Sequence, residues 1–202
     1  MKIDCYPIGD YEENSYILRE NKKVVFIDPG KRADFLISQV KEDEKVFGIL
    51  LTHGHDDHTG AVDDLVDQYH CPIYIHNDDL LLVKTKGNAY SGGSMHPISY
   101  EVLPFEETLE LDDLTFKIHH TPGHTSGSVL IQYKNVLFTG DTLFANSIGR
   151  TDLFSGSDEE MIQTLKYILT LPSDLTIYPG HGPSSTIAQE KMTNYYLNHF
   201  TL

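Results

Sequence analysis

The chain has 202 residues, of which 40% are hydrophobic and 22% are charged, so one domain over residues 1–202 can bury a substantial core. Asp and Glu number 30 against 15 Lys and Arg, which gives a formal net charge of −15 at pH 7. This balance argues against nucleic acid and anionic membranes as partners, because both attract cationic surfaces.

Short apolar runs rich in β-branched residues recur along the chain and predict strands. They are KIDCYPI (2–8), SYILR (15–19), VVFID (24–28), VFGILL (46–51), PIYIH (72–76), LTFKIHH (114–120), SVLIQY (128–133), NVLFTG (135–140) and LTIYPG (175–180). Helical spacing of apolar residues predicts helices over 32–44, 58–70, 157–171 and 184–200. Ser157 or Asp158 should cap the third helix, and Pro172 should end it. This order predicts an α/β domain with helices outside two sheets.

The beginning of the chain, MKIDCYPIGDYEEN, contains four acidic residues, so we expect no hydrophobic signal segment there. No apolar run reaches the length of a membrane span. Cys5 and Cys71 lie far apart in strand-like segments and are expected to be small buried side chains rather than a disulfide framework. We therefore expect a cytoplasmic protein with no membrane partner.

The segment KGNAYSGGSMHPIS, residues 86–99, is rich in Gly and Ser and follows no regular pattern. Irregular loops of this length in a compact domain are usually either functional or mobile. The segment is therefore interpreted as either a substrate lid or a plain surface loop.

The stretch LTHGHDDHTG, residues 51–60, contains three histidines and two aspartates directly after an apolar run. Within it, His53, His55, Asp57 and His58 form the pattern H-x-H-x-D-H. Each of these side chains can donate a lone pair to a metal ion. The two alternating histidines can reach one ion together, and the aspartate and histidine at the helix entrance suit a second. The pattern predicts a metal site after the carboxyl end of a strand.

Three further candidate ligands follow other strands in glycine-rich turns. They are His124 in HHTPGHTSGS, Asp141 in VLFTGDTLF and His181 in TIYPGHGPSS. Each alone would be a weak signal, but their common position after strands supports a shared metal site. The remaining histidines match no motif and are expected to have structural roles: His70, His76, His96, His119, His120 and His199.

The motifs H-x-H-x-D-H, T-P-G-H-T, F-T-G-D-T-L-F and P-G-H-G resemble those of the metallo-β-lactamase superfamily over nearly the whole chain. The resemblance implies a four-layer αββα sandwich with two divalent metal ions at the edge between its sheets. It assigns His53, His55, His124 and Asp141 to one ion, and Asp57, His58, His181 and the bridging Asp141 to the other. It also implies that Asp28 hydrogen-bonds to the metal loop.

The run TGDTLF followed by SIGRTD resembles glyoxalase II, a thioester hydrolase that acts on acylated glutathione. Two ions lower the pKa of a shared water, so that the resulting hydroxide can attack a carbonyl. With hydroxide and the two carboxylates the site keeps a charge of about +1, which admits an anionic substrate. We expect hydrolysis of a small anionic thioester such as an S-(hydroxyacyl)glutathione, with Asp57 as a catalytic residue besides its role as a ligand.

Other reactions remain as alternatives. Persulfide dioxygenase, which uses one iron ion and oxygen, shares H-x-H-x-D-H and the GRTD run, although the ending P-G-H-G-P-S is more similar to the hydrolases. A metal-dependent esterase, lactonase or nuclease of the same superfamily and a non-enzymatic binding module complete the alternatives. Nitrogen and oxygen ligands without thiolate admit zinc, iron or manganese, and zinc is the expected metal.

Arg150 matches the position at which glyoxalase II enzymes have a lysine that contacts the glutathione part of the substrate. The resemblance therefore implies that Arg150 binds substrate, since its planar guanidinium can bind a carboxylate bidentately. The alternative is an ion pair with Asp152 or Asp158 that stabilises the loop. Glyoxalase II also has a C-terminal helical domain that helps to hold glutathione. We expect this chain to lack it, so the thiol part of the substrate stays open.

Overall fold

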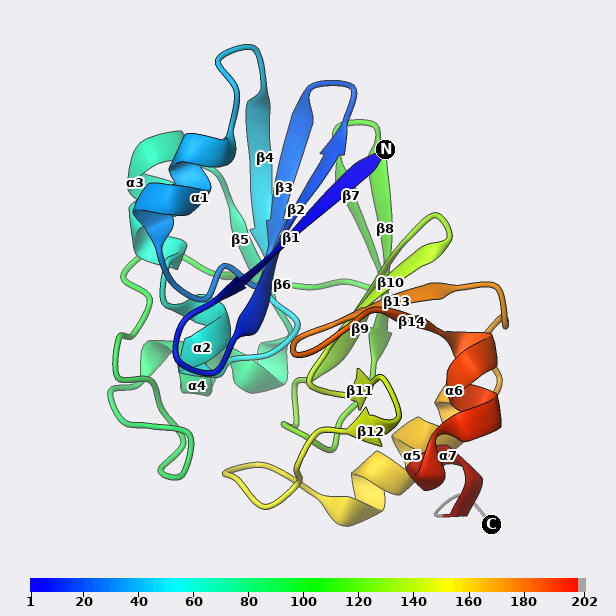
Figure 1. Cartoon of the computed structure of the whole chain (residues 1–202). Helices are drawn as coiled ribbons and strands as arrows, with labels where there is room; N and C mark the ends of the chain where they lie inside the picture. The colour runs from blue at the N-terminus through cyan, green and yellow to red at the C-terminus, as the bar shows by residue number, and fades with distance from the viewer. Residues whose placement is uncertain (200–202) are drawn as a thin grey trace.

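In the computed structural model, which describes residues 1–199, two six-stranded sheets pack face to face between layers of helices (Figure 1). The first sheet, in the order β1-β2-β3-β4-β5-β6, consists of β1 (Lys2–Ile8), β2 (Glu13–Glu20), β3 (Lys23–Ile27), β4 (Lys45–Leu50), β5 (Ile73–Ile75) and β6 (Leu103–Pro104). The second, in the order β14-β13-β10-β9-β8-β7, consists of β7 (Thr108–Leu111), β8 (Leu114–His120), β9 (Val129–Tyr133), β10 (Val136–Gly140), β13 (Thr176–Pro179) and β14 (Ser185–Thr186). A small ribbon pairs β11 (Leu143–Phe144) with β12 (Ser147–Ile148).

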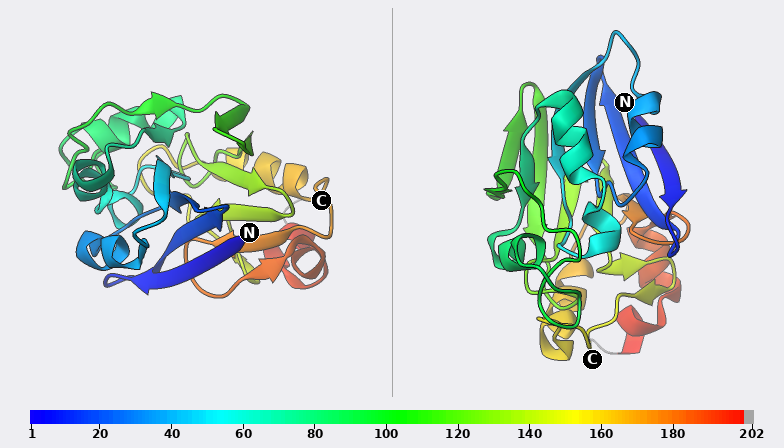
Figure 2. Two further views of the ribbon diagram at one scale, coloured as in Figure 1. Left: turned by 90° about the horizontal axis from the view of Figure 1, so that it is seen from above. Right: turned by 90° about the vertical axis from the view of Figure 1, so that its left-hand side faces the viewer.

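The helices lie on the outer faces of the two sheets, as the two further views show (Figure 2). Beside the first sheet are α1 (Ala33–Gln39), α2 (Asp56–Thr59), α3 (Val62–Tyr69), the short 3-10 helix η1 (Asn77–Asp79) and α4 (Leu80–Lys84). Beside the second sheet are α5 (Asp158–Ile168), α6 (Ile187–Thr193) and α7 (Tyr195–His199). The predicted four-layer αββα sandwich is confirmed. No helix within residues 1–199 is long and apolar enough to cross a bilayer.

Side chains that alternate along the strands fill the spaces between the layers. In β3, Val25 packs into the core between the sheets, whereas Val24 packs toward α1 and α3. In β10, Phe138 faces the same inter-sheet core and Leu137 packs toward α5. All four side chains are almost completely buried, which contributes about 2 kcal/mol each. Because these strands are buried on both faces, they appear in the sequence as continuous apolar runs.

The third predicted helix has the expected start. The Oγ atom of Ser157 accepts a hydrogen bond from the backbone N–H of Glu160 at 3.2 Å, so Ser157 is the N-cap of α5. The helix ends at Ile168, and one further turn leads to Pro172. The predicted helix over 32–44 is too long, because α1 ends at Gln39. The exposed, charged residues 41–43 that follow have no apolar side chain to pack on the sheet.

The predicted helix over 58–70 is divided into α2 and α3 at Gly60. The chain packs so closely there that a side chain at Gly60 would clash with the carbonyl O of Gly30. The predicted helix over 184–200 is also divided. It begins with strand β14, and Asn194 separates α6 from α7 by donating to the carbonyl O of Ser147 at 3.0 Å. Phe200 lies outside the described residues.

The topology brings several strand ends to one edge of the sandwich. β8 and β10 are both antiparallel to β9, and β13 is parallel to β10, so these three strands run in the same direction. Their carboxyl ends lie at the same edge as the carboxyl end of β4 in the first sheet, because the turns that follow them meet there. This is the edge at which ligand sites commonly form.

Candidate metal centre

The structure brings the seven predicted ligands together from four segments. His53, His55, Asp57 and His58 follow β4, His124 follows β8, Asp141 follows β10 and His181 follows β13. Each of these segments begins at the end of a strand.

One group consists of His53, His55 and His124. One ligand atom from each lies within 4.8 Å of the other two, and all three side chains are buried. Nδ1 of His55 lies 3.0 Å from Nε2 of His124. In tetrahedral zinc sites the metal–nitrogen bonds are about 2.0–2.1 Å long. The two nitrogens are therefore already about as close to each other as two ligands of one ion.

The other group consists of Asp57, His58 and His181. Oδ2 of Asp57 lies 3.5 Å from Nε2 of His181 and 3.9 Å from Nε2 of His58. This group is more open than the first, because the side chains of Asp57 and His181 each keep 26% of their surface exposed. It therefore lies on the side that a substrate would approach.

Asp141 lies between the two groups. Its Oδ1 is 3.3 Å from Nε2 of His58, and its Oδ2 is 3.6 Å from Nε2 of both His124 and His181. One carboxylate thus faces histidines of both groups, which is the position required of a bridging ligand.

The donor atoms fit a pair of cations. Four buried side-chain atoms of the centre have no hydrogen-bond partner within the described structure: Nε2 of His53, His55 and His58, and Oδ1 of Asp141. Buried polar atoms without partners are costly, at about 1–3 kcal/mol each. Their concentration in one place indicates a group that accepts their lone pairs, and nitrogen and oxygen donors suit divalent transition metals.

Other polar groups fix the orientation of the candidate ligands. The expected contact of Asp28 with the metal loop is present: Oδ2 lies 3.1 Å from Nδ1 of His58, and Oδ1 accepts from the backbone N–H of Thr52 at 2.7 Å. Nδ1 of His124 lies 2.7 Å from the carbonyl O of Arg150. Nδ1 of His181 lies 3.0 Å from the carbonyl O of Tyr11. Such contacts select the tautomer that presents the other nitrogen to a metal.

Burial and neighbouring charges shift the pKa values of the candidate ligands. Burial lowers the pKa of His53 and lowers that of His55 to about 3, so both rings are neutral. Burial opposes the charge on His58, but Asp141 and Asp57 outweigh it and raise the pKa of His58 well above its usual value. Because a metal ligand must be the neutral imidazole, metal binding at His58 is coupled to pH.

Sequence motifs did not reveal two buried carboxylates beside the centre. Asp79 accepts from the backbone N–H groups of Gly54 and Gly127 at 2.9 and 2.8 Å, and so connects the turn of His53 and His55 to the turn of His124. Glu13 lies 3.8 Å from Nδ1 of His58, and burial raises its pKa well above the usual value. Nothing in the local sequence separates buried Asp79 from its exposed neighbour Asp78, so only the fold identifies it.

A cavity of about 520 Å³ opens onto the centre. Side chains of both candidate groups line it, together with the apolar side chains of Met95, Phe144 and Leu153 and the ring of Tyr90. Arg150 also lines it, but its guanidinium forms a bidentate ion pair with Asp152, with Nε–Oδ1 at 2.6 Å and Nη2–Oδ2 at 2.7 Å. The alternative pairing with Asp158 does not occur; that carboxylate accepts from the hydroxyl of Thr151.

The irregular segment 86–99 forms one wall of this cavity. Asp56, which stands between two candidate ligands, holds the segment in place. Its carboxylate accepts from the backbone N–H of Met95 at 3.0 and 3.1 Å and from the hydroxyl of Ser94. The wall and the metal turn are therefore connected directly. That the segment acts as a lid stays a prediction.

We expect Asp56→Ala to release the segment, because Met95 N–H then loses its acceptor. Hydrogen exchange of the Met95 amide should become at least about tenfold faster, which corresponds to about 1.4 kcal/mol. Asp63→Ala is the matched control: Asp63 accepts from the N–H of Ser99 at 3.0 and 3.1 Å, at the far end of the same segment. It should accelerate exchange at Ser99 alone. Equal protection of Met95 in Asp56→Ala and the unaltered protein would contradict the connection.

Comparison with known proteins agrees with this geometry. A model of the metallo-beta-lactamase superfamily matches residues 8–181. Hydroxyacylglutathione hydrolase GloC of Haemophilus influenzae is 37% identical over 211 residues, covering 98% of this chain and 99% of that protein. The crystal structure of the B3 metallo-beta-lactamase BLEG-1 is 38% identical, with a TM-score of 0.88 over 97% of this chain and 99% of its own. TTHA1623, crystallised in a di-iron-bound form, is 34% identical, with a TM-score of 0.86 over 96% of this chain and 99% of its own.

Proposed function

The chain belongs to the metallo-beta-lactamase superfamily as a metal-dependent hydrolase, and from this premise we propose that it cleaves the thioester bond of a small anionic substrate. The observation that carries the proposal is Asp141, which faces both histidine groups and so favours a pair of ions rather than one. The full-length similarity to a hydroxyacylglutathione hydrolase supports a thioester as the substrate.

When bound, two divalent ions supply an acidified water and polarise the substrate carbonyl. His53, His55 and His124 would hold one ion, and Asp57, His58 and His181 the other, with Asp141 shared. Burial opposes the charge of Asp57, but His58 and His181 outweigh it and lower the pKa of Asp57, so its carboxylate is ionised. Lining the cavity, Asp57 can accept a hydrogen bond from the attacking water and orient it toward the carbonyl.

The departing thiolate needs no proton donor, because its conjugate acid has a pKa of about 8.5. The apolar wall formed by Phe144 and Leu153 suits the acyl part of a substrate. Arg150 also lines the cavity, and its positive charge suits an anionic group of the substrate. We propose zinc as the metal, with iron as the alternative that the di-iron form of TTHA1623 supports. A cytoplasmic location stays a prediction. Both cysteines are free thiols; Cys71 is buried as expected, but Cys5 is exposed, so the expectation of a buried side chain is wrong there.

The reaction is tested by adding S-lactoylglutathione to metal-loaded enzyme without oxygen. We expect free thiol to be released with no need for oxygen. Oxygen uptake with glutathione persulfide and negligible thioester hydrolysis would identify a dioxygenase instead. The similarity to BLEG-1 favours a second candidate, hydrolysis of a β-lactam, so a chromogenic cephalosporin is the third substrate. Preferential turnover of the cephalosporin would contradict the thioester proposal.

Arg150 is tested by separating its two proposed roles. If Arg150 binds substrate, Arg150→Ala should raise KM for an anionic thioester by about fivefold or more, equivalent to roughly 1–3 kcal/mol of charge-assisted hydrogen bonding. Asp152→Ala, which releases the guanidinium from its bidentate partner, should leave KM unchanged or lower it. Metal content should stay the same in both variants. If both variants instead melt early and keep the original KM, the ion pair serves only to stabilise the loop.

A further inference from the structure

A second cluster of ligand-type side chains lies outside the candidate metal centre, where β5 and β8 end. His76 follows β5 of the first sheet, and His120 is the last residue of β8 in the second. Their rings stack with 4.0 Å between centroids and an interplanar angle of 11°. The carboxylate of Asp78 lies beside both, 3.7 Å from Nδ1 of His76 and 4.0 Å from Nε2 of His120. Two imidazoles and one carboxylate from both halves of the fold thus lie side by side.

The rings of His76 and His120 are less fully engaged within the protein than the adjacent ring of His119. Burial lowers the pKa of His76, and the neighbouring His120 lowers it further, so the His76 ring is neutral; its lone pair on Nδ1 faces the backbone N–H of Asp78. The adjacent His119 differs, because its Nδ1 contacts the hydroxyl of Tyr167 and its Nε2 lies 2.8 Å from Oε1 of Gln132. Both ring nitrogens of His119 are therefore engaged within the protein, whereas His76 and His120 each engage one. Nδ1 of His76 accepts from the backbone N–H of Asp78 at 3.3 Å, and Nε2 of His120 lies 2.8 Å from the carbonyl O of Ser126.

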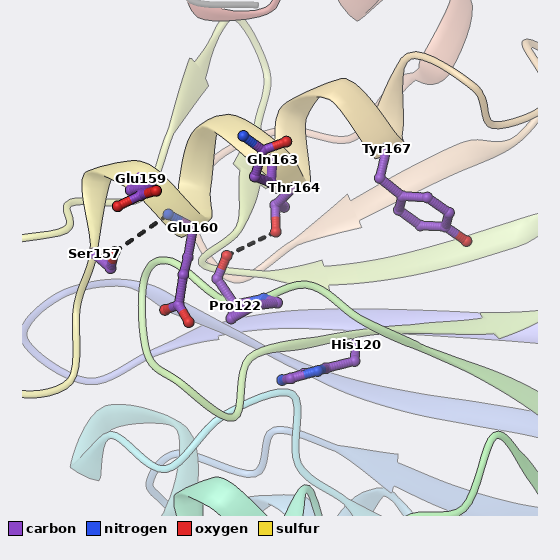
Figure 3. Close-up of a pocket in the computed structure, with 8 residues that line it drawn as sticks. All are labelled: His120, Pro122, Ser157, Glu159, Glu160, Gln163, Thr164 and Tyr167. Atoms are coloured by element: carbon purple, nitrogen blue, oxygen red, sulfur yellow. Dashed lines mark hydrogen bonds between the residues drawn. The ribbon is translucent and has the colours of Figure 1, made fainter.

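The cluster borders open space. His120 lines a cavity of about 680 Å³ whose opposite wall is α5, with Glu160 and Tyr167 extending toward it (Figure 3). His76 and His120 together line an adjoining cavity of about 460 Å³, and Glu106, Glu107 and Lys117 also line it. An ion held here would be accessible from solvent, and the surrounding glutamates make the local charge favourable to a cation.

We propose that His76, Asp78 and His120 form a further site for one divalent transition-metal ion, separate from the candidate metal centre. One ligand atom from each residue lies within 4.8 Å of the other two. Ligands of a tetrahedral ion are about 3.4 Å apart for bonds of about 2.1 Å, so the three must approach by roughly 1 Å. The side chains of Asp78 and His120 are exposed and can move. Because an ion lies in the plane of each ligating ring, the His120 ring must also turn out of its stack on His76 and leave the carbonyl O of Ser126. Two nitrogens and one oxygen select zinc-like ions over magnesium or calcium.

Occupancy of this site would connect the two sheets beside the candidate centre. Asp78 directly precedes Asp79, the buried carboxylate that joins the turn of Gly54 to that of Gly127. A bound ion would fix the segment that carries Asp79 to the end of β8. The expected consequence is a higher melting temperature, because an ion that binds only the folded state stabilises it. This inference does not depend on the proposed reaction.

The test is zinc binding by equilibrium dialysis and elemental analysis of protein whose central site is already saturated. We expect one further equivalent of zinc per chain in the unaltered protein. His120→Phe keeps an aromatic ring over His76 but removes both nitrogens, and Asp78→Asn removes the negative charge. Each variant should hold one equivalent fewer. His199→Gln is the matched control, because His199 is an exposed histidine elsewhere, with Nδ1 2.9 Å from the carbonyl O of Tyr195.

Two outcomes would overturn the proposal. One is that the unaltered protein takes up no further zinc, and the other is that His120→Phe and Asp78→Asn hold as much as it does. Ring nitrogen resonances give an independent readout: the further equivalent should shift those of His76 and His120 and leave those of His119 in place. Shifts confined to other histidines would assign the ion elsewhere.

Discussion

Replacing Asp141 with alanine is expected to lower metal content at both candidate ion positions and to reduce kcat/KM by at least about 10³-fold, or about 4 kcal/mol. The reason is geometric, because this carboxylate lies within 3.3–3.6 Å of histidine nitrogens from both groups. Its loss also removes one negative charge from a site that has to hold two cations. Metal-to-protein ratios and thioester turnover, measured on the same preparation, check this.

The matched variant is His181→Ala. His181 belongs to only one group, so the variant should keep the ion held by His53, His55 and His124 and chiefly weaken the other. The metal-to-protein ratio should therefore be about one ion per chain below that of the unaltered protein, and lower still for Asp141→Ala. If Asp141→Ala keeps the occupancy of the unaltered protein, Asp141 is not a bridging ligand.

Gly180→Ala should impair the centre almost as severely as the loss of a ligand. A methyl group at this position would clash with Oδ1 of Asp141 and would lie 2.7 Å from Cε1 of His58. The backbone nitrogen of Gly180 is also held by the carbonyl O of Gly140 at 2.8 Å, so the turn cannot easily retreat. We expect the carboxylate to be displaced, with a loss of about 10²-fold or more in kcat/KM and reduced metal content.

Gly182, two residues later in the same motif, separates this effect from backbone strain. It has a φ of +75°, and a methyl group there would meet no atom within 4 Å. Gly182→Ala should therefore cost about 1–2 kcal/mol of stability through its left-handed conformation, and lower the melting temperature by a few degrees. Metal content and kcat/KM should stay close to those of the unaltered protein. Equal activity losses in the two variants would show that strain in the turn, not contact with Asp141, is responsible.

The sequence alone predicted helices outside two sheets and indicated the candidate ligands, whose binding of metal stays a prediction. Runs such as VVFID and VLFTG are apolar on both faces because their strands are buried on both faces. Such a run can be recognised from a few consecutive residues. The candidate ligands could be predicted because His53, His55, Asp57 and His58 occupy one short turn, where spacing alone brings them together. Their placement in the fold agrees with the motif resemblance.

The tertiary structure decided what depends on contacts between distant segments. Asp79 and Glu13 beside the centre, the division of one helix at Gly60 against Gly30, and the pairing of Arg150 with Asp152 rather than Asp158 have no local signature. The same holds for His76 and His120, which the sequence separates by more than forty positions and two sheets bring into contact. Burial, steric clashes and the choice of ion-pair partner depend on which surfaces come into contact. Local sequence patterns determine the helices and strands but not how their surfaces pack together.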